Sequence, residues 1–73
     1  MPDAPTLQNT LKVQRATRNL TQADLAAIAG VTRRPINAIE GGRMVPSVFL
    51  ALRIARSLNM KVDELFSLGD EAP

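Results

Sequence analysis

Positively charged side chains gather in the middle of this 73-residue chain. Residues 12–43 carry six basic and two acidic side chains, a net charge of +4, whereas residues 44–73 carry three basic and four acidic ones, a net charge of −1. Such an uneven distribution favours one cationic face and an anionic partner. An ordinary solvated surface would give the same counts, so the charges alone leave both interpretations open.

Residue types that commonly carry catalysis or bind metals are scarce. The chain contains no cysteine and no histidine, so it lacks disulfides, thiolate ligands and the commonest general base. Asp63 and Glu64 are sequence neighbours, and neighbouring residues on a helix surface do not converge on one side. We therefore expect a protein that is not an enzyme and that uses no cofactor and no metal.

Neither a membrane span nor an export signal is visible in the sequence. No apolar stretch approaches the roughly 20 residues that a span needs. The start, MPDAPT, lacks the basic and apolar parts of a signal peptide. We expect a cytoplasmic protein with one folded domain over residues 7–68. Residues 1–6 and 69–73 are expected to form a flexible N-terminal arm and a flexible tail.

The elements that must position these charges are short helices. Five segments show apolar residues at helical spacing, and no run alternates with a period of two. The sequence therefore predicts an all-α, compact five-helix fold without strands. The expected helices cover about residues 8–18, 21–30, 32–40, 47–58 and 62–67. Leu65 and Phe66 are expected to point inward from the last of them.

Residues with strong preferences for helix ends mark the expected boundaries. Thr21, Thr32 and Ser47 are expected as N-caps, and Asp24 follows Thr21 at the spacing of a capping box. Residues that tolerate left-handed backbone or end helices follow the first four helices, at Asn19, Gly30, Gly41, Gly42 and Asn59.

Residues 22–41 predict two helices that pack across a tight turn. Ala26 is expected where the helices cross, because only a small side chain allows a close approach, and Gly30 is expected to make the turn. Such a turn holds the second helix away from the protein body, so that it can enter a DNA major groove. Leu25, Ile28 and Ala29 are expected to form the apolar face of the helix over residues 21–30. Val31, Ile36 and Ile39 are expected to pack the following helix against it.

The sequence resembles the lambda-repressor/Cro family of helix-turn-helix regulators, also called the XRE family, over about residues 9–68. The blocks that carry the resemblance are NTLKVQRATRNLTQADLA, AGVTRRPINAIEGGR, PSVFLALRIARSL and VDELF, and their spacing also fits. The resemblance implies a lambda-repressor-like domain and a sequence-specific transcriptional regulator, in the role of a repressor. Such a protein binds double-stranded DNA as a homodimer.

The resemblance assigns a reading role to the third expected helix, as the recognition helix. Thr32, Arg33, Arg34 and Asn37 lie at its start and on its outer face. The arginines could read guanine through O6 and N7, and Asn37 could read adenine. Ala38 shares that face and could touch a thymine methyl group. For each side chain, a phosphate contact or plain solvation is the alternative.

Four further positions match residues outside the reading face. Gln22, at the start of the second helix, resembles a phosphate-contacting residue, and the N–H groups there are open to an anion. Arg43 resembles a residue that contacts the DNA backbone. Arg15 and Glu40 match a partly buried salt bridge that ties the first helix to the end of the third, which implies a structural role.

Three positions depart from the family pattern. Gln14 replaces a common leucine, which weakens the expected packing of the first helix. Pro35 falls in the first turn of the recognition helix, where its missing N–H is tolerated, but it disfavours helical geometry at Arg34. Lys61 replaces a common capping serine, so the last helix is expected to fray.

The fourth expected helix is apolar on most sides. Such a helix is buried or meets a partner, and a chain this short cannot easily surround it. Phe49 is the surplus apolar residue, and Met44 and Met60 are also expected at the surface, so all three are candidates for a dimer contact. A second interpretation stays open, because antitoxins of the same fold bind a protein partner as well as their operator.

Overall fold

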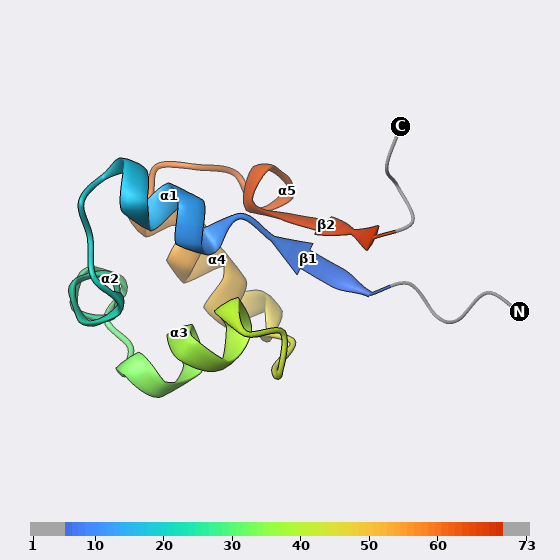
Figure 1. The fold of residues 1–73 in the computed structure, drawn as a ribbon, viewed down its shortest axis with the longest axis horizontal. Coiled ribbons are helices and arrows are strands. Elements are labelled where there is room, and N and C mark those ends of the chain that lie inside the picture. Colours follow the sequence, from blue (N-terminus) through green and yellow to red (C-terminus); the bar gives the residue numbers. More distant parts are fainter. Residues whose placement is uncertain (1–5, 70–73) are drawn as a thin grey trace, which may run out of the picture.

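Five helices and a two-stranded sheet make up the computed structural model of this protein, which describes residues 6–69 (Figure 1). The five predicted helices are confirmed, and none within residues 6–69 is long and apolar enough to cross a membrane. In chain order the elements are β1 (Leu7–Asn9), α1 (Leu11–Thr17), α2 (Gln22–Ala29), α3 (Arg33–Glu40), α4 (Val48–Ser57), α5 (Val62–Leu65) and β2 (Phe66–Leu68).

The prediction of a fold without strands is wrong. β1 and β2 pair antiparallel and extend from the helices as a short ribbon (Figure 1). The first helix accordingly begins later than expected, at Leu11, and the last one ends earlier, at Leu65. Three-residue strands are too short to show alternation, and their partners lie almost a whole chain length apart. The register joins Leu7 to Leu68, Gln8 to Ser67 and Asn9 to Phe66.

The ends of the described chain continue the pairing of the two strands. The Gly69 N–H donates to the Thr6 carbonyl oxygen over 2.7 Å. These two residues belong to the segments expected as a flexible arm and a flexible tail. The rest of those segments, residues 1–5 and 70–73, lies outside the described residues.

The N-terminal caps follow the sequence signals at two of three helices. Thr21 Oγ1 accepts from the Asp24 N–H over 3.0 Å, and Asp24 Oδ2 accepts from the Thr21 N–H over 2.9 Å, which confirms the capping box. Ser47 Oγ accepts from the Leu50 N–H over 3.0 Å. Thr32 is the N-cap of α3 by position, but its side chain makes no capping hydrogen bond.

Four helices end on the same left-handed turn. Asn19, Gly30, Gly42 and Asn59 have φ between 56° and 74°. In each turn, the next residue donates its N–H to the carbonyl five positions back over 2.9 Å, the signature of a Schellman motif. Gly41, also expected to end α3, keeps right-handed backbone with φ −81°. Asparagine and glycine are the residues that tolerate left-handed backbone, which is why these endings were predictable.

One apolar core lies among the helices, and all of its members are almost inaccessible to solvent. Ala26, Ile36 and Ile39 belong to it, and Val31 packs against it, as predicted. Ile28 was expected there but is 56% exposed, because the buried stripe of α2 runs over Leu25, Ala26 and Ala29. The core contains Leu11, Leu25, Ala26, Ile36, Ile39, Ala51, Ile54, Ala55, Leu58, Leu65 and Phe66.

Two departures from the family pattern are accommodated by polar contacts. Gln14 is half-buried, and its Oε1 accepts from Arg18 Nη1 over 2.9 Å. Lys61 precedes α5, and its N–H donates to Glu64 Oε1 over 2.7 Å. The side chain of Glu64 therefore satisfies one free donor at the start of this four-residue helix, although the capping serine is absent.

Candidate nucleic-acid interface

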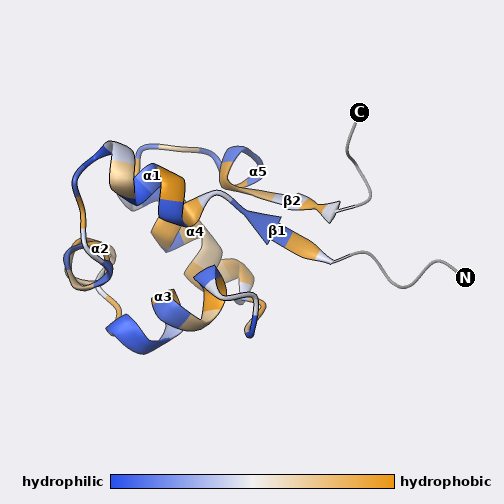
Figure 2. Ribbon diagram, viewed as in Figure 1, coloured by the Kyte–Doolittle hydropathy of each residue, from blue (hydrophilic) through white to orange (hydrophobic). Residues whose placement is uncertain are grey.

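Helix α3 divides into a buried face and an exposed face. Ile36 and Ile39 are buried, and their three-residue spacing places them on one side of the helix. Arg33, Arg34 and Asn37 are exposed on the other side, together with Thr32 just before the helix. The first turn of α3 is accordingly hydrophilic in Figure 2. Ala38, also expected on the outer face, is only partly exposed.

The turn between α2 and α3 is fixed from two sides. Gly30 supplies the left-handed backbone, with φ 74°. Arg53 reaches over from α4 and donates from Nε to the Ala29 carbonyl oxygen over 2.8 Å. Its guanidinium also occupies the place that a side chain at Gly30 would take. Sequence reasoning missed Arg53, because 24 residues separate it from the carbonyl that it caps.

The predicted ion pair ties α3 to α1. Arg15 Nε lies 2.5 Å from Glu40 Oε2, and Arg15 Nη2 donates to Glu40 Oε1 over 2.9 Å. The side chains are only 14% and 7% exposed. Arg15 Nη1 also donates to the Leu20 carbonyl oxygen, so the guanidinium joins α1, the following loop and the end of α3. A two-point pair of this kind fixes direction as well as distance.

The Glu40 carboxylate is kept charged despite its burial. Burial raises the pKa of Glu40, but the hydrogen bonds from Arg15 and Gln22 and the charges of Arg15 and Lys12 lower it, and the net effect is a pKa below the usual value. The same contact with Glu40 raises the pKa of Arg15. Both partners are therefore ionised at neutral pH.

A chain of hydrogen bonds leads from this ion pair to the surface. We call Glu40, Gln22, Asn37 and Arg43 the polar chain. Gln22 Nε2 donates to Glu40 Oε1 over 3.1 Å, and Gln22 Oε1 accepts from Asn37 Nδ2 over 3.2 Å. Arg43 Nη2 donates to Asn37 Oδ1 over 2.6 Å. Arg33 Nε joins at Gln22 Oε1, 3.4 Å away. Four predicted DNA-facing residues are thus brought together.

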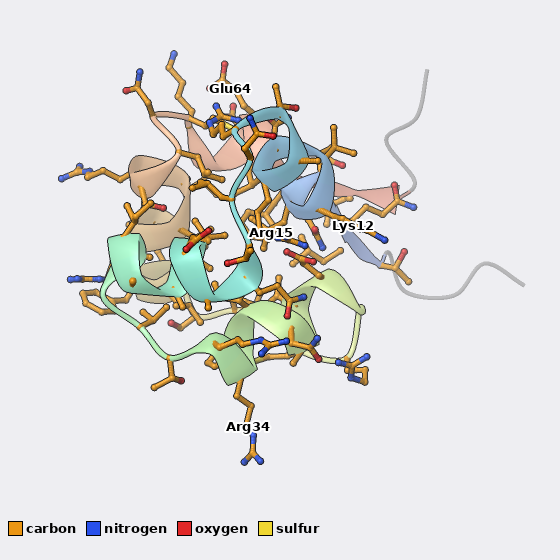
Figure 3. The ribbon with its side chains drawn as sticks, turned by 60° about the vertical axis from the view of Figure 1, so that its left-hand side comes forward. Lys12, Arg15, Arg34 and Glu64 are labelled. Atoms are coloured by element: carbon orange, nitrogen blue, oxygen red, sulfur yellow. The ribbon has the colours of Figure 1, made fainter. Side chains whose placement is uncertain are left out.

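Arg34 stands apart from the polar chain. It is exposed, and its side chain makes no hydrogen bond or ion pair with any other residue in the described range 6–69. Pro35 was expected to disturb helical geometry here, but α3 contains both residues. Figure 3 shows the Arg34 side chain pointing away from the protein body, at the opposite end of the molecule from the acidic Glu64.

Lys12 is a cationic residue that sequence reasoning counted but did not place at the interface. It lines the same surface depression as Gln22, Asn37 and Arg43, with Glu40 and Arg15 also in its wall. Figure 3 shows Lys12 and Arg15 extending from the same helix, α1. Only the excess of basic residues in the segment pointed to it, since one lysine on a helix carries no motif.

Apolar side chains of α4 form a second exposed surface, which we call the α4 face. Phe49 is 68% exposed, with Val48 and Leu52 beside it on the helix, and Arg53 covers the Phe49 ring from 5.5 Å. Among the other dimer candidates, Met44 is exposed, whereas Met60 is half-buried against the core. A hollow that is almost wholly apolar continues this face, and it is lined by Leu7, Val45, Pro46, Val48, Ala51, Leu52, Val62 and Phe66.

The sequence is similar to those of helix-turn-helix regulators. The profile of the helix-turn-helix family matches residues 11–65. An uncharacterized HTH-type transcriptional regulator of Methanocaldococcus jannaschii is 45% identical over 65 residues, which cover 89% of this chain and 98% of the relative. The HTH-type transcriptional regulator YgzD of Bacillus subtilis is 40% identical, with the same two coverages.

A solved structure shares the fold. The restriction-modification controller protein C.AhdI from Aeromonas hydrophila superposes with a TM-score of 0.70 at 28% sequence identity. The match covers 74% of this chain and 82% of that protein. The expected lambda-repressor-like helical fold is therefore confirmed, with the small sheet as an addition to it.

Proposed function

Because the chain belongs to the helix-turn-helix transcriptional regulators of the lambda-repressor/Cro (XRE) type, we propose that it represses transcription by binding an operator sequence in double-stranded DNA. The observation that carries this proposal is the exposed face of α3, with Arg33 and Arg34 in its first turn. A major groove about 12 Å wide admits a helix, and arginine pairs with guanine O6 and N7 there.

The surroundings of α3 suit the phosphates of the same DNA. Gln22 is the first residue of α2, where free N–H groups favour an anion. Arg43 and Lys12 add two cations from other elements. We assign phosphate contacts to these three residues, base contacts to Arg33 and Arg34, and a contact with a thymine methyl group to Ala38. Thr32 lies beside them at the start of the helix. Most of the affinity then comes from phosphates, so binding falls steeply as salt is raised.

The proposed active form is a homodimer. The exposed apolar residues of α4, led by Phe49, would be covered in a dimer, and a chain this small gains stability from the extra burial. Two-fold symmetry then places two half-sites about one helical turn of DNA apart. Phe49→Glu is expected to give a monomer in sedimentation, and an unchanged dimer would move the interface to another surface.

Selection of bound duplexes from a random DNA pool tests the proposal as a whole. The expected result is an enriched two-fold symmetric sequence with guanines in each half-site, bound far more weakly as the salt concentration rises. Failure to retain any duplex at low salt would contradict it. A protein that binds an operator acts where the DNA is, so we place it in the cytoplasm.

A second candidate function is an antitoxin-like interaction with another protein. The apolar hollow beside α4 favours it, because an exposed apolar surface marks an interaction site. The Phe49→Glu variant separates the two functions in the same assay. A dimeric repressor loses affinity for its two-part operator when Phe49 is changed, whereas a protein that uses this face only for another partner keeps it.

A further inference from the structure

The Asn37 side chain is held from both sides within the polar chain. Its amide Nδ2 donates to Gln22, and its carbonyl Oδ1 accepts from Arg43 at 2.6 Å, the shortest hydrogen bond that Arg43 makes. Gln22 is in turn fixed by Glu40, which Arg15 holds. Asn37 thus links the partly buried ion pair to an exposed cation, which a residue that only reads a base has no need to do.

The position of Arg43 depends on that link. Its backbone closes the Schellman motif of α3, since its N–H donates to the Ala38 carbonyl oxygen over 2.9 Å. Its side chain then turns back over Gly41 and reaches Asn37, where Nη2 also lies 3.3 Å from the backbone oxygen. A guanidinium has five N–H donors. Nη1 and Nε make no hydrogen bond among residues 6–69, so they are free for a ligand.

We propose that Asn37 is a positioning residue, which holds the Arg43 guanidinium in place to bind a DNA phosphate. The inference rests on the proposed function and deepens it. It reassigns Asn37 from an adenine reader to the support of a backbone contact. Arg34 differs from Arg43, because no side chain among residues 6–69 holds its guanidinium, which must be ordered by the DNA itself.

The two roles of Asn37 give different results in a salt titration. A lost base contact relaxes the preference at one operator position, whereas a lost cationic phosphate contact weakens binding to all sequences and lowers the salt slope by about one. Asn37 is neutral and releases no counterion of its own. A changed salt slope in Asn37→Ala must therefore come from a neighbouring cation.

The experiment compares Asn37→Ala, Arg43→Ala and the double variant on a selected duplex and on a scrambled duplex. For each single variant, binding to the selected duplex and binding to the scrambled duplex are expected to weaken by the same factor. Each is also expected to lower the salt slope by up to about one. The double variant should be no weaker than Arg43→Ala. Arg34→Ala serves as the control, and it should lose preference for the selected duplex.

Gly41→Ala tests the same link without touching a proposed contact residue. The backbone at Gly41 has φ −81°, which alanine adopts freely, but a Cβ there meets the Arg43 guanidinium. We expect Gly41→Ala to show the same salt slope as Arg43→Ala and an unchanged or higher melting temperature.

Three results would overturn the inference. They are a relaxed preference at one base position in Asn37→Ala with an unchanged salt slope, additive losses in the double variant, and a Gly41→Ala protein with the original slope. Failure of the unmodified protein to bind any duplex is a different outcome, since it overturns the proposed function and this inference with it.

Discussion

The two ends of α3 are built in opposite ways. At the C-terminal end, the Glu40 side chain is only 7% exposed and accepts three hydrogen bonds, two from Arg15 and one from Gln22. At the N-terminal end, Arg34 is exposed and its side chain makes none within the described range. A buried charge must be satisfied by the protein itself, whereas a binding group must keep its donors free. One short helix is thus anchored at one end and open at the other.

The largest expected effect comes from breaking the anchored end. Glu40→Gln removes the charge that neutralises Arg15, whose side chain is only 14% exposed. Leaving such a partner without its counter-charge costs about 3 kcal/mol of unfolding free energy. The measurement is the urea midpoint. Arg34→Ala is the matched control at the open end and should change the stability by less than about 0.5 kcal/mol. Equal losses at the two ends would contradict the comparison.

Breaking the open end should act on binding and leave folding intact. Arg33→Ala is expected to cost about 1–3 kcal/mol of affinity and to relax the base preference at one operator position. Competition with single-position operator variants measures both quantities. If all sequences are weakened equally, Arg33 contacts a phosphate and Arg34 alone reads bases.

A smaller effect on stability is expected from the N-cap residues of α2 and α3. Thr21→Ala removes a capping hydrogen bond of α2 and should cost about 1 kcal/mol of unfolding free energy. Thr32→Ala is the matched change at α3, where the hydroxyl makes no such bond. Its loss is expected to be within a few tenths of a kcal/mol. A larger loss at Thr32 would show that its hydroxyl caps α3 in solution.

The pH dependence of stability should also report on the anchored end. The pKa of Glu40 is lower in the folded protein than its ordinary value of 4.5. Its contribution is therefore complete above that value and is lost as the pH falls through the folded pKa. The difference in unfolding free energy between the original protein and Glu40→Gln should shrink between about pH 7 and about pH 3. Asp24, whose pKa is lowered by hydrogen bonds with Thr21, titrates in both proteins and cancels. A constant difference would contradict this account.

The parts of the fold that depend on local chemistry could be predicted from the sequence. Asn19, Gly30 and Asn59 ended their helices, and Thr21 with Asp24 capped α2, because these residue types favour those conformations within a few positions. Ile28 was misplaced because several apolar stripes can be drawn on an eight-residue helix, and only the packed neighbours select one.

Features that join distant segments could not be predicted in the same way. The pairing of Leu7–Asn9 with Phe66–Leu68 and the cap that Arg53 places on α2 both depend on tertiary contacts. The residues of the candidate interface came from the family resemblance, and the resemblance gave them separate roles. Their hydrogen-bonded connection through Asn37 became visible only in three dimensions.

Methylation interference tests the central claim most directly, because it asks whether the exposed face of α3 lies in a major groove. Guanine N7 faces that groove, so its methylation blocks an arginine that reads it. We predict that binding of a selected duplex is lost on methylation of guanines in two patches one helical turn apart. We also predict that Arg34→Ala abolishes the interference at one position in each patch. Binding that tolerates methylation at every guanine, or an Arg34→Ala pattern identical to the original, would contradict the account.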